Sequence, residues 1–485
     1  MFNWKAISKI TGMLTSIEAA CFLVPMSVSL FYGENDWTAF LWSFLLTAMA
    51  GISMWLIGRK APRHITHRDG LCIVVSVWIL FALFGMLPLL LSGTTTSLTD
   101  AFLEMMSGFS TTGASVLENI DELPHGILLW RSLTHLIGGL GIIVLTIAIL
   151  PALGVNEIKL SESEQLGPLQ EKIHPRIKTT SKYLLLVYLI LNISCILMLY
   201  LCGMDLFDAT CYAFSICATG GLAPHSVGLI YYNSQLIEYV AYVFMFLCAV
   251  NFVLFYLVLF KGKFKRLTTD LEIRWYIGII LTATAFVMYT LYKTGHFTVE
   301  ESFRYALFQI VSSMTTSGLA NADTLSWPPV TFLVLGAVML IGGCTHSTAG
   351  GLKVMRLILL WKITANEINY RLHPHAIFPV KVGHTIIHNS EKIKLLSFVT
   401  IYFTAVFAGI VLLSACGVAL TDSFSVCIAA IANGGAIYGH PHSNLDSWTF
   451  LPPMAKWIAS FLMLLGRLEI FTVLMFFSPK FWRGE

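Results

Sequence analysis

The stretch FSTTGAS, residues 109–115, places two threonines, two serines and a glycine inside an otherwise apolar region. Related stretches occur three more times, as ATGGLAP at 218–224, MTTSGLAN at 314–321 and IANGGAIYG at 431–439. The aligned glycines of successive copies are 108, 97 and 117 residues apart. Self-similarity at a nearly constant interval indicates a repeated structural unit, so the chain is predicted to contain four copies of one unit.

The four motifs share a Thr or Asn, then a small residue, then a glycine. The aligned positions are Thr111, Thr112, Gly113, Thr219, Gly220, Gly221, Thr316, Ser317, Gly318, Asn433, Gly434 and Gly435. One Thr-Gly pair alone carries no weight, because small residues are common where helices touch in membranes. Four copies with matched surroundings favour a shared function over accidental packing.

An acidic residue precedes each glycine. Asp100, Asp208 and Asp422 stand 13 residues before theirs, and Glu301 stands 17 before Gly318. Because the helix dipole stabilises a carboxylate near a helix N-terminus, each copy is predicted to be a helix that begins at the acid and ends at the glycine motif. About ten apolar residues cannot span a bilayer, so each short helix is predicted to dip halfway into the membrane from outside.

The composition identifies a multi-spanning membrane protein, since 56% of the 485 residues are hydrophobic, 12% are charged and the mean hydropathy is +0.75. Longer apolar stretches flank every short helix, at 71–92 and 126–150, 182–202 and 236–260, 275–294 and 329–363, and 393–415 and 452–478. The predicted fold is therefore an all-α polytopic membrane protein, in which four parallel helix–half-helix–helix repeats surround one pore.

Two further apolar stretches, 11–31 and 37–57, form an additional N-terminal hairpin. The predicted units are 1–68 for this hairpin and 69–157, 158–268, 269–372 and 373–485 for the four repeats.

The basic residues lie at one end of the predicted spans. Segments 1–10, 58–70, 154–182, 261–274, 353–394 and 478–485 hold 25 of the 30 Lys and Arg. By the positive-inside rule these segments are cytoplasmic, which places both termini inside the cell.

The motifs suit the chemistry of a cation filter. Non-helical backbone at membrane depth is tolerated where it is buried in protein or lines a water-filled path. Four such stretches around one axis could replace the hydration shell of a cation with backbone carbonyls, and glycine permits the positive φ values that aim those oxygens inward.

Two other classes of protein are alternatives to a channel. A membrane enzyme lacks support, because the sequence contains no HExxH or GxSxG motif, and the ten cysteines include no CxxC pair that would indicate a zinc site or a disulfide framework. A K⁺/H⁺ or Na⁺-coupled symporter remains an alternative, although many such transporters use inverted repeats.

The chain resembles the TrkH-type potassium uptake subunits of the Trk/Ktr/HKT superfamily. The resemblance covers essentially the whole chain. Beyond the four motifs, it rests on IGGLGIIVLTIAILP at 137–151, IGGCTHSTAGGLKVMR at 341–356, HPHAIFPVKVG at 373–383 and LLGRLEIFTVLMFF at 464–477.

The resemblance implies a potassium-permeable pore in the bacterial cytoplasmic membrane, with K⁺ held at the twelve aligned motif positions. It also implies a homodimer and a cytoplasmic TrkA-like regulatory ring, through which alone ATP/ADP or NAD(H) would act; no nucleic acid is expected. Relatives that admit sodium often carry serine at the first motif glycine, so Gly113 favours potassium.

Four glycines and several hydroxyl residues in IGGCTHSTAGGLK, residues 341–353, interrupt the apolar stretch 329–363, so a continuous helix is not expected there. The resemblance further places a gate in this segment. Its residues are Gly342, Gly343, Cys344, Thr345, His346, Ser347, Thr348, Ala349, Gly350 and Gly351, with Arg467 beside the ion path. This chain departs from the commoner GGCAGSTGGG form at Thr345, His346 and Ala349. The alternative for the loop is an ordinary packed kink. The alternative for Arg467, whose charge would be costly facing lipid unpaired, is a structural pair with Glu469 or another carboxylate.

Overall fold

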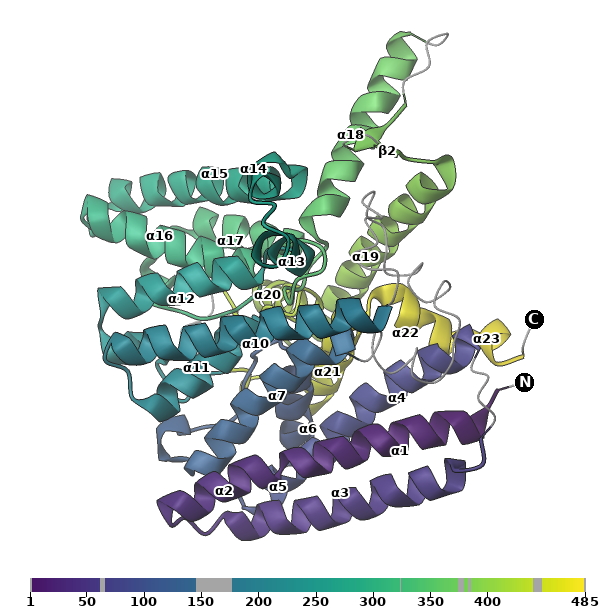
Figure 1. Ribbon diagram of the computed structural model, residues 1–485. Helices are drawn as coiled ribbons and strands as arrows, with labels where there is room; N and C mark the ends of the chain where they lie inside the picture. The colour runs from purple at the N-terminus through teal and green to yellow at the C-terminus, as the bar shows by residue number, and fades with distance from the viewer. Residues whose placement is uncertain are drawn as a thin grey trace.

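Figure 1 shows a computed structural model of the chain, which describes residues 2–61, 66–144, 177–322, 324–373, 379–382, 385–438 and 447–483. Within these ranges six helical segments are long and apolar enough to cross a membrane, or up to eight when each of two bent helix pairs is counted as one span. The end of the predicted span 126–150, most of the basic segment 154–182 and most of the motif 373–383 lie outside the described residues.

The N-terminal hairpin consists of α1 (Trp4–Cys21), α2 (Leu23–Tyr32) and α3 (Trp37–Gly58), as the two apolar stretches predict. Its helices pack closely through glycines. A Cβ added to Gly12 on α1 would lie 2.5 Å from the Trp55 backbone N, and one added to Gly51 on α3 would lie 2.5 Å from Ser16 Oγ. The two backbones approach this closely because neither glycine carries a side chain.

Four repeats follow, each with a short helix between longer helical segments. The main helices are α4 (His67–Gly85), α5 (Leu87–Leu91), α6 (Leu98–Phe109) and α7 (His125–Val144) in repeat 1; α10 (Ile177–Leu201), α11 (Leu206–Ala218), α12 (Gln235–Cys248) and α13 (Phe252–Leu259) in repeat 2; α15 (Leu271–Thr294), α16 (Val299–Met314), α17 (Pro329–Ile341) and α18 (Val354–Leu372) in repeat 3; and α19 (Asn389–Ala415), α20 (Leu420–Ile431), α21 (Pro453–Arg467) and α22 (Ile470–Phe477) in repeat 4.

Minor elements complete the described chain. They are the 3₁₀ turns η1 (Ile120–Glu122), η3 (Gly228–Tyr232) and η4 (Thr324–Ser326), the short helices α14 (Lys265–Thr269) and α23 (Pro479–Arg483), and a two-stranded antiparallel hairpin of β1 (Lys381–Val382) and β2 (Thr385–Ile386).

The four short helices α6, α11, α16 and α20 begin and end where the acids and glycine motifs predict. Ser97 caps α6 and Asp205 caps α11, while Thr298 and Glu301 form a reciprocal capping box at α16. Helix α16 has 16 residues, against 12 or 13 in the other three. This extra turn explains why Glu301 stands four residues farther from its glycine than the other acids do.

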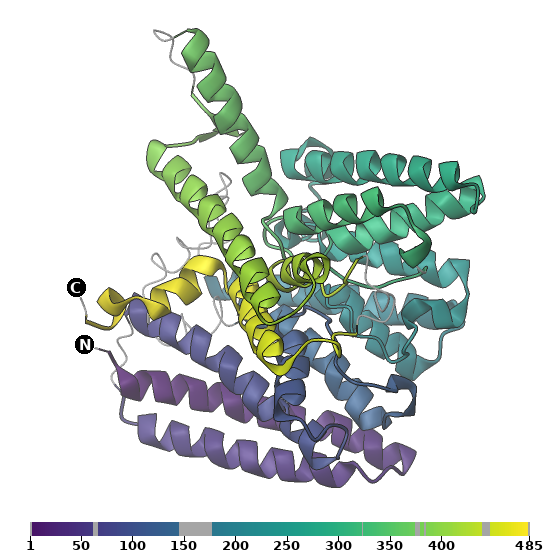
Figure 2. The same cartoon turned by 180° about the vertical axis from the view of Figure 1, so that it is seen from behind.

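The repeats form a closed circle. Each short helix packs against its own flanking helices and against the second long helix of the preceding repeat: α11 on α7, α16 on α12, α20 on α17 and α6 on α21. The last of these contacts joins repeat 4 to repeat 1. Both views show the N-terminal hairpin of α1 and α3 along one edge of the molecule and α18 projecting from the opposite edge (Figures 1 and 2).

Within the part of the chain that the structure describes, three of the second long helices are broken. The predicted interruption of 329–363 is confirmed, since α17 ends at Ile341 and α18 starts at Val354. The apolar stretches 236–260 and 452–478 each contain a sharp bend, because α12 and α13 meet at 96° and α21 and α22 at 118°. At the first bend the Ala249 carbonyl accepts a hydrogen bond from the Cys344 N–H, so the interrupted segment of repeat 3 uses the backbone group that the bend frees.

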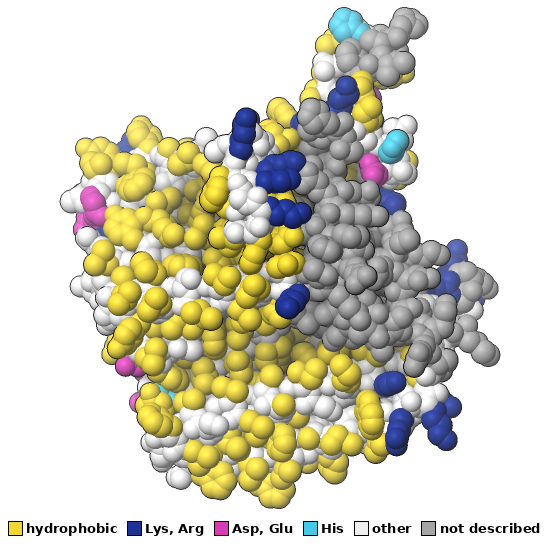
Figure 3. Space-filling model, viewed as in Figure 1, with side chains coloured by type: hydrophobic (Ala, Val, Ile, Leu, Met, Phe, Trp, Pro, Cys, Tyr) yellow, Lys and Arg dark blue, Asp and Glu magenta, His cyan; other side chains and the backbone are white. Residues whose placement is uncertain are grey.

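The described part of the face in Figure 3 is widely apolar, with few charged side chains. Most Lys and Arg side chains visible on this face lie toward the side of the two termini, while several Asp and Glu side chains lie at the opposite edge. A broad apolar surface of this kind suits hydrocarbon rather than water.

Substituting Gly12 by Val should destabilise the hairpin, because the new side chain would meet the α3 backbone; overpacking of this kind costs about 1–3 kcal/mol. We expect a lower midpoint of thermal unfolding in detergent. Gly278→Val on α15 is the matched control, since no atom lies within 4 Å of a Cβ added there. Equal midpoints for the two variants would contradict this packing.

Candidate ion-conducting site

Each short helix ends in the same backbone turn. At the end of α6 the Thr111 N–H donates to the Gly108 carbonyl at 3.0 Å, and the Thr112 N–H donates to the Ser107 carbonyl at 2.8 Å. The same two bonds, reaching three and five residues back, recur after α11, α16 and α20. This pattern is a Schellman cap, which satisfies the last carbonyls of a helix and turns the chain away from its axis.

The turn requires left-handed backbone at two positions of every motif. The first lies at Thr111, Thr219, Thr316 and Asn433, with φ of 54°, 56°, 56° and 55°. The second lies at Gly113, Gly221, Gly318 and Gly435, with φ of 87°, 98°, 69° and 64°. The positive φ predicted for the glycines is confirmed. Positive φ at the threonines was not anticipated, and for a β-branched residue it is strained, as is common at functional sites.

The four motifs form a closed ring. Each motif glycine lies against the carbonyl of the middle motif residue in the next repeat, so close that no side chain fits between them. A Cβ added to the motif glycine would lie this far from the carbonyl oxygen of the neighbouring repeat: 1.9 Å from Gly113 to Gly220 O, 2.5 Å from Gly221 to Ser317 O, 2.4 Å from Gly318 to Gly434 O, and 2.2 Å from Gly435 to Thr112 O. Repeat 4 thus returns to repeat 1, and all twelve predicted motif residues come together around one axis.

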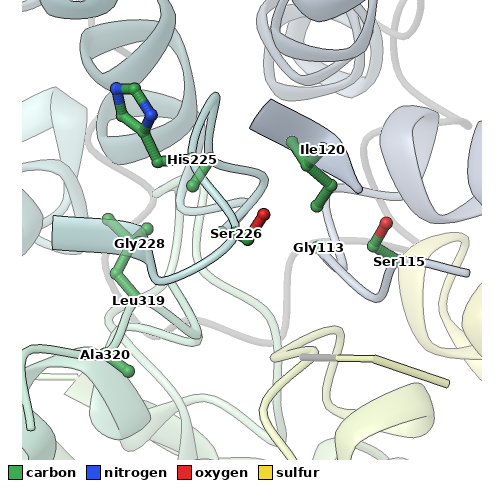
Figure 4. A pocket seen from close by; sticks show the side chains of 10 residues that line it. Gly113, Ser115, Ile120, His225, Ser226, Gly228, Leu319 and Ala320 are labelled. Carbon is green, nitrogen blue, oxygen red and sulfur yellow. The ribbon is translucent and has the colours of Figure 1, made fainter. Parts of the chain in front are cut away.

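A cavity opens beside this ring toward the acidic ends of the short helices. It is lined by Gly113, Ser115, Ile120, Gly221, Ala223, His225, Ser226, Gly228, Leu319 and Ala320. Figure 4 shows His225 and Ser226 from repeat 2 on one side and Gly113, Ser115 and Ile120 from repeat 1 on the other. The cavity therefore adjoins the motifs of repeats 1 and 2.

Two buried ion pairs contact residues that closely follow the ring motifs, Ser115 in repeat 1 and Asn321 in repeat 3. In repeat 1, Arg131 Nε lies 2.8 Å from Glu104 Oε1, and their side chains are 2% and 0% exposed. Between repeats 2 and 3, Arg304 Nη1 lies 2.8 Å from Glu238 Oε2, which also accepts a hydrogen bond from Asn321. Sequence reasoning missed both pairs, although an ionisable residue inside an apolar segment is itself a signal of function.

The interrupted segment of repeat 3 lies directly beneath the ring. The Gly350 N–H donates to Thr316 Oγ1 at 2.7 Å, and Thr348 Oγ1 donates to the Cys217 carbonyl at 3.1 Å. A Cβ on Gly350 would lie 1.9 Å from the Ala432 carbonyl oxygen. The loop therefore contacts the motif of repeat 3 and the residues just before the motifs of repeats 2 and 4.

Glu272 and Arg467 hold this loop from two sides. Glu272 accepts hydrogen bonds from the Thr345 N–H at 2.7 Å and from Thr345 Oγ1 at 2.9 Å. Arg467 is 8% exposed and donates to the carbonyls of Thr348 and Gly138, both at 2.9 Å. The predicted loop residues and Arg467 are thus in contact.

The alternative pairing of Arg467 with Glu469 is not formed. Glu469 Oε1 instead lies 2.6 Å from Arg356 Nη2. His346, the histidine peculiar to this loop, is exposed, has a φ of 56°, and accepts a hydrogen bond from the Phe252 N–H through its carbonyl. Its backbone, rather than its ring, thereby ties the loop to the bend between α12 and α13.

Comparison with known proteins agrees with this geometry. The family profile described as "TrkH: Cation transport protein" matches residues 38–484. The chain belongs to the TrkH family. It is 36% identical to the Trk system potassium uptake protein TrkG of Escherichia coli K12 and 35% identical to TrkH of Halomonas elongata, with 99% of both chains covered in each case.

The fold of this TrkH-family chain is similar to a solved one. The crystal structure of the potassium transporter TrkH from Vibrio parahaemolyticus matches it with a TM-score of 0.90 and 33% identity, over 99% of this chain and 100% of the other. The predicted resemblance and the all-α membrane architecture are thereby confirmed. The chain is a transport protein rather than an enzyme.

In this TrkH-family member a histidine that lines the cavity joins repeats 1 and 2. His225 Nε2 lies 2.8 Å from Asp208 Oδ2, and its Nδ1 lies 3.1 Å from Asp121 Oδ1. Its ring stacks on Tyr231 at 3.8 Å; Tyr232 donates to Asp208, and Ser226 to Asp121. Burial lowers the pKa of His225, but the two carboxylates outweigh this effect and raise the pKa above its usual value.

This link should depend on pH. Because the folded state raises the His225 pKa, the stabilisation is complete below the unfolded pKa of about 6.5 and is lost as the pH rises through the folded value. We expect His225→Gln to lower the thermal unfolding midpoint at acidic pH and to converge with the parent at alkaline pH. The exposed loop histidine His296 provides the control substitution, His296→Gln. A constant difference across the pH range would exclude titration of His225.

Proposed function

We propose that this protein carries potassium ions into the cell through a pore whose selectivity filter is the closed ring formed by residues 111–113, 219–221, 316–318 and 433–435. The ring is the observation that supports this function most directly. It brings four stretches of non-helical backbone to one place inside an apolar protein, where their carbonyls can replace the water around a cation. The relatives named as potassium uptake proteins agree with the choice of ion.

The short helices add to the attraction for a cation. Their C-terminal ends face the ring, so the negative ends of four helix dipoles point toward it. Their N-terminal turns carry Asp100, Asp208, Glu301 and Asp422 on the opposite side. An approaching cation thus meets acidic groups first and the carbonyl ring next.

We further propose that residues 342–351 form the gate, with Arg467 as the group that holds it closed. In its observed position the loop lies against three of the four repeats just below the ring. The Arg467 guanidinium fixes the loop at Thr348 and puts a positive charge in a poorly solvated path, where it opposes a cation.

The same family resemblance supports a homodimer and a TrkA-like cytoplasmic ring that controls the gate, with ATP/ADP or NAD(H) acting through that partner. The gathering of Lys and Arg on the side of the termini supports a cytoplasmic location for both ends in a bacterial inner membrane (Figure 3). A basic surface there can also dock a partner of opposite charge.

Gly113→Ser should lower the preference for K⁺ over Na⁺, because a Cβ both disfavours a φ of 87° and meets Gly220 O at 1.9 Å. Gly221→Ser, with 2.5 Å to Ser317 O, should act in the same direction but less strongly. We expect the permeability ratio to fall about tenfold for Gly113→Ser, equal to about 1.4 kcal/mol of discrimination.

The measurement is the reversal potential of single-channel currents from purified protein in bilayers with opposed K⁺ and Na⁺ gradients. Gly278→Ser on α15, where a Cβ meets nothing within 4 Å, is the control. Unchanged potentials in both filter variants would refute the filter assignment. Flux that requires a proton or sodium gradient, without unitary currents, would instead establish the symporter alternative.

Arg467→Ala should raise K⁺ flux into liposomes in the absence of any partner, since it removes both the charge and the hydrogen bond to Thr348. An increase on the order of tenfold corresponds to about 1.4 kcal/mol off the barrier. Deleting residues 345–349 should act similarly, and the double variant should show less than the sum of both effects, because one barrier is involved. Flux at or below the parent level in a correctly folded deletion variant would return the loop to a packing kink.

A further inference from the structure

The Glu104 carboxylate lies behind the first filter motif and holds the backbone that leaves it. Glu104 is on α6 and its side chain is fully buried. Its Oε2 accepts a hydrogen bond from the Val116 N–H at 2.9 Å, and both oxygens lie 3.1 Å from Ser115 Oγ. One carboxylate therefore fixes the second and third residues after Gly113 to the helix that precedes the motif.

The Arg131 guanidinium extends this contact to the next repeat. Its Nε donates to Glu104 and its Nη2 donates to Ser115 Oγ at 3.0 Å, while Nη1 donates to the Ala223 carbonyl at 3.2 Å. Ala223 stands two residues after Gly221, just as Ser115 stands two residues after Gly113. The planar fork of one arginine thus joins equivalent positions of two neighbouring motifs.

Stability alone does not explain this pair. Well-packed apolar side chains often replace a buried ion pair without loss, since desolvation offsets much of the attraction between the charges. What apolar side chains cannot supply is directed hydrogen bonds to the Val116 N–H and to the Ala223 carbonyl. In repeat 3 the aligned residue is uncharged: Gln309 stands nine residues before Gly318, as Glu104 stands nine before Gly113, and its Nε2 donates to Asn321 Oδ1 at 3.3 Å.

We propose that the Glu104–Arg131 pair is a positioning device for ion discrimination: it sets the first two filter motifs at a fixed separation across the ring. This inference rests on the proposed function of the ring as the filter. Discrimination between cations depends on where the carbonyls are held, so a shift of the backbone on either side of the contact between Gly113 and Gly220 alters the ion site.

Conservative variants separate geometry from charge. Glu104→Asp keeps the negative charge but shortens the side chain by one methylene. Arg131→Lys keeps the positive charge but loses the planar guanidinium, whose three nitrogens bind Glu104, Ser115 and Ala223. Ser115→Ala is the mildest change, because it removes only the hydroxyl that both partners bind. Glu367→Gln is the matched control: Glu367 pairs with Arg371 on α18 at 3.1 Å, and these two side chains are 58% and 80% exposed.

The experiment measures two quantities for each purified variant: the reversal potential under opposed K⁺ and Na⁺ gradients, and the midpoint of thermal unfolding. We expect the permeability ratio to fall severalfold in Glu104→Asp and Arg131→Lys, to fall less in Ser115→Ala, and to stay at the parent value in Glu367→Gln. The double variant Glu104→Gln/Arg131→Met should unfold at a higher temperature than Glu104→Gln alone, yet remain poorly selective.

A parent-like ratio in Arg131→Lys and Ser115→Ala, with only the unfolding midpoint lowered, would overturn the proposal and leave a purely structural pair. If Arg131→Lys does not fold, Ser115→Ala decides on the same criterion. Gly113→Ser, measured in parallel, identifies the other failure: if it too keeps the parent ratio, the filter assignment itself is wrong.

Discussion

The architecture depends on one constraint: backbone that leaves the helix at membrane depth has no water to satisfy its amides and carbonyls. The four motifs meet this constraint in the same way. A Schellman cap satisfies the N–H groups of the first two motif residues, and the glycine two positions after the left-handed residue lets the chain lie against the next repeat. Since each motif is enclosed by its neighbour, the ring is complete only when all four repeats are in place.

The bends in the long helices obey the same constraint. The segment between α17 and α18 has backbone N–H groups that no helix satisfies. Several of them donate hydrogen bonds to carbonyls at a helix end or at the bend of another helix. The Leu352 and Lys353 N–H groups donate to Leu340 and Ile341 at the end of α17, and the Cys344 N–H donates to Ala249 at the bend of α12. The loop beneath the ring and the bend in repeat 2 are therefore parts of one hydrogen-bonded arrangement rather than separate irregularities.

Local signals made the short helices predictable. An N-cap residue and an acid in the first turn specify where a helix starts, and the glycine motif specifies where it stops. All three signals are local, because they lie close to the helix that they delimit. The positive φ of the motif threonines could not be predicted from these local signals. Residues branched at Cβ disfavour the left-handed backbone conformation, and only the surrounding ring imposes it. The bend at 249–251 escaped prediction because the sequence Ala-Val-Asn contains neither Gly nor Pro.

Pairs such as Glu104 with Arg131, or Glu238 with Arg304, are separated by 27 and 66 residues, so their contact follows from packing that the sequence pattern alone does not specify.

The distribution of charge along the axis separates selection from control. On the side of the ring where the short helices begin, His225 stands between Asp208 and Asp121, and the N-terminal turns of the short helices carry the other acids. On the opposite side, the buried Arg467 lies at the loop, where screening by water is weak. In the proposed direction of transport, attraction thus acts before the ring and repulsion after it. With the proposed filter and gate in these positions, a change in the loop alters how often ions pass without altering which ions the ring prefers, because the carbonyls are held by contacts within the motifs and behind them.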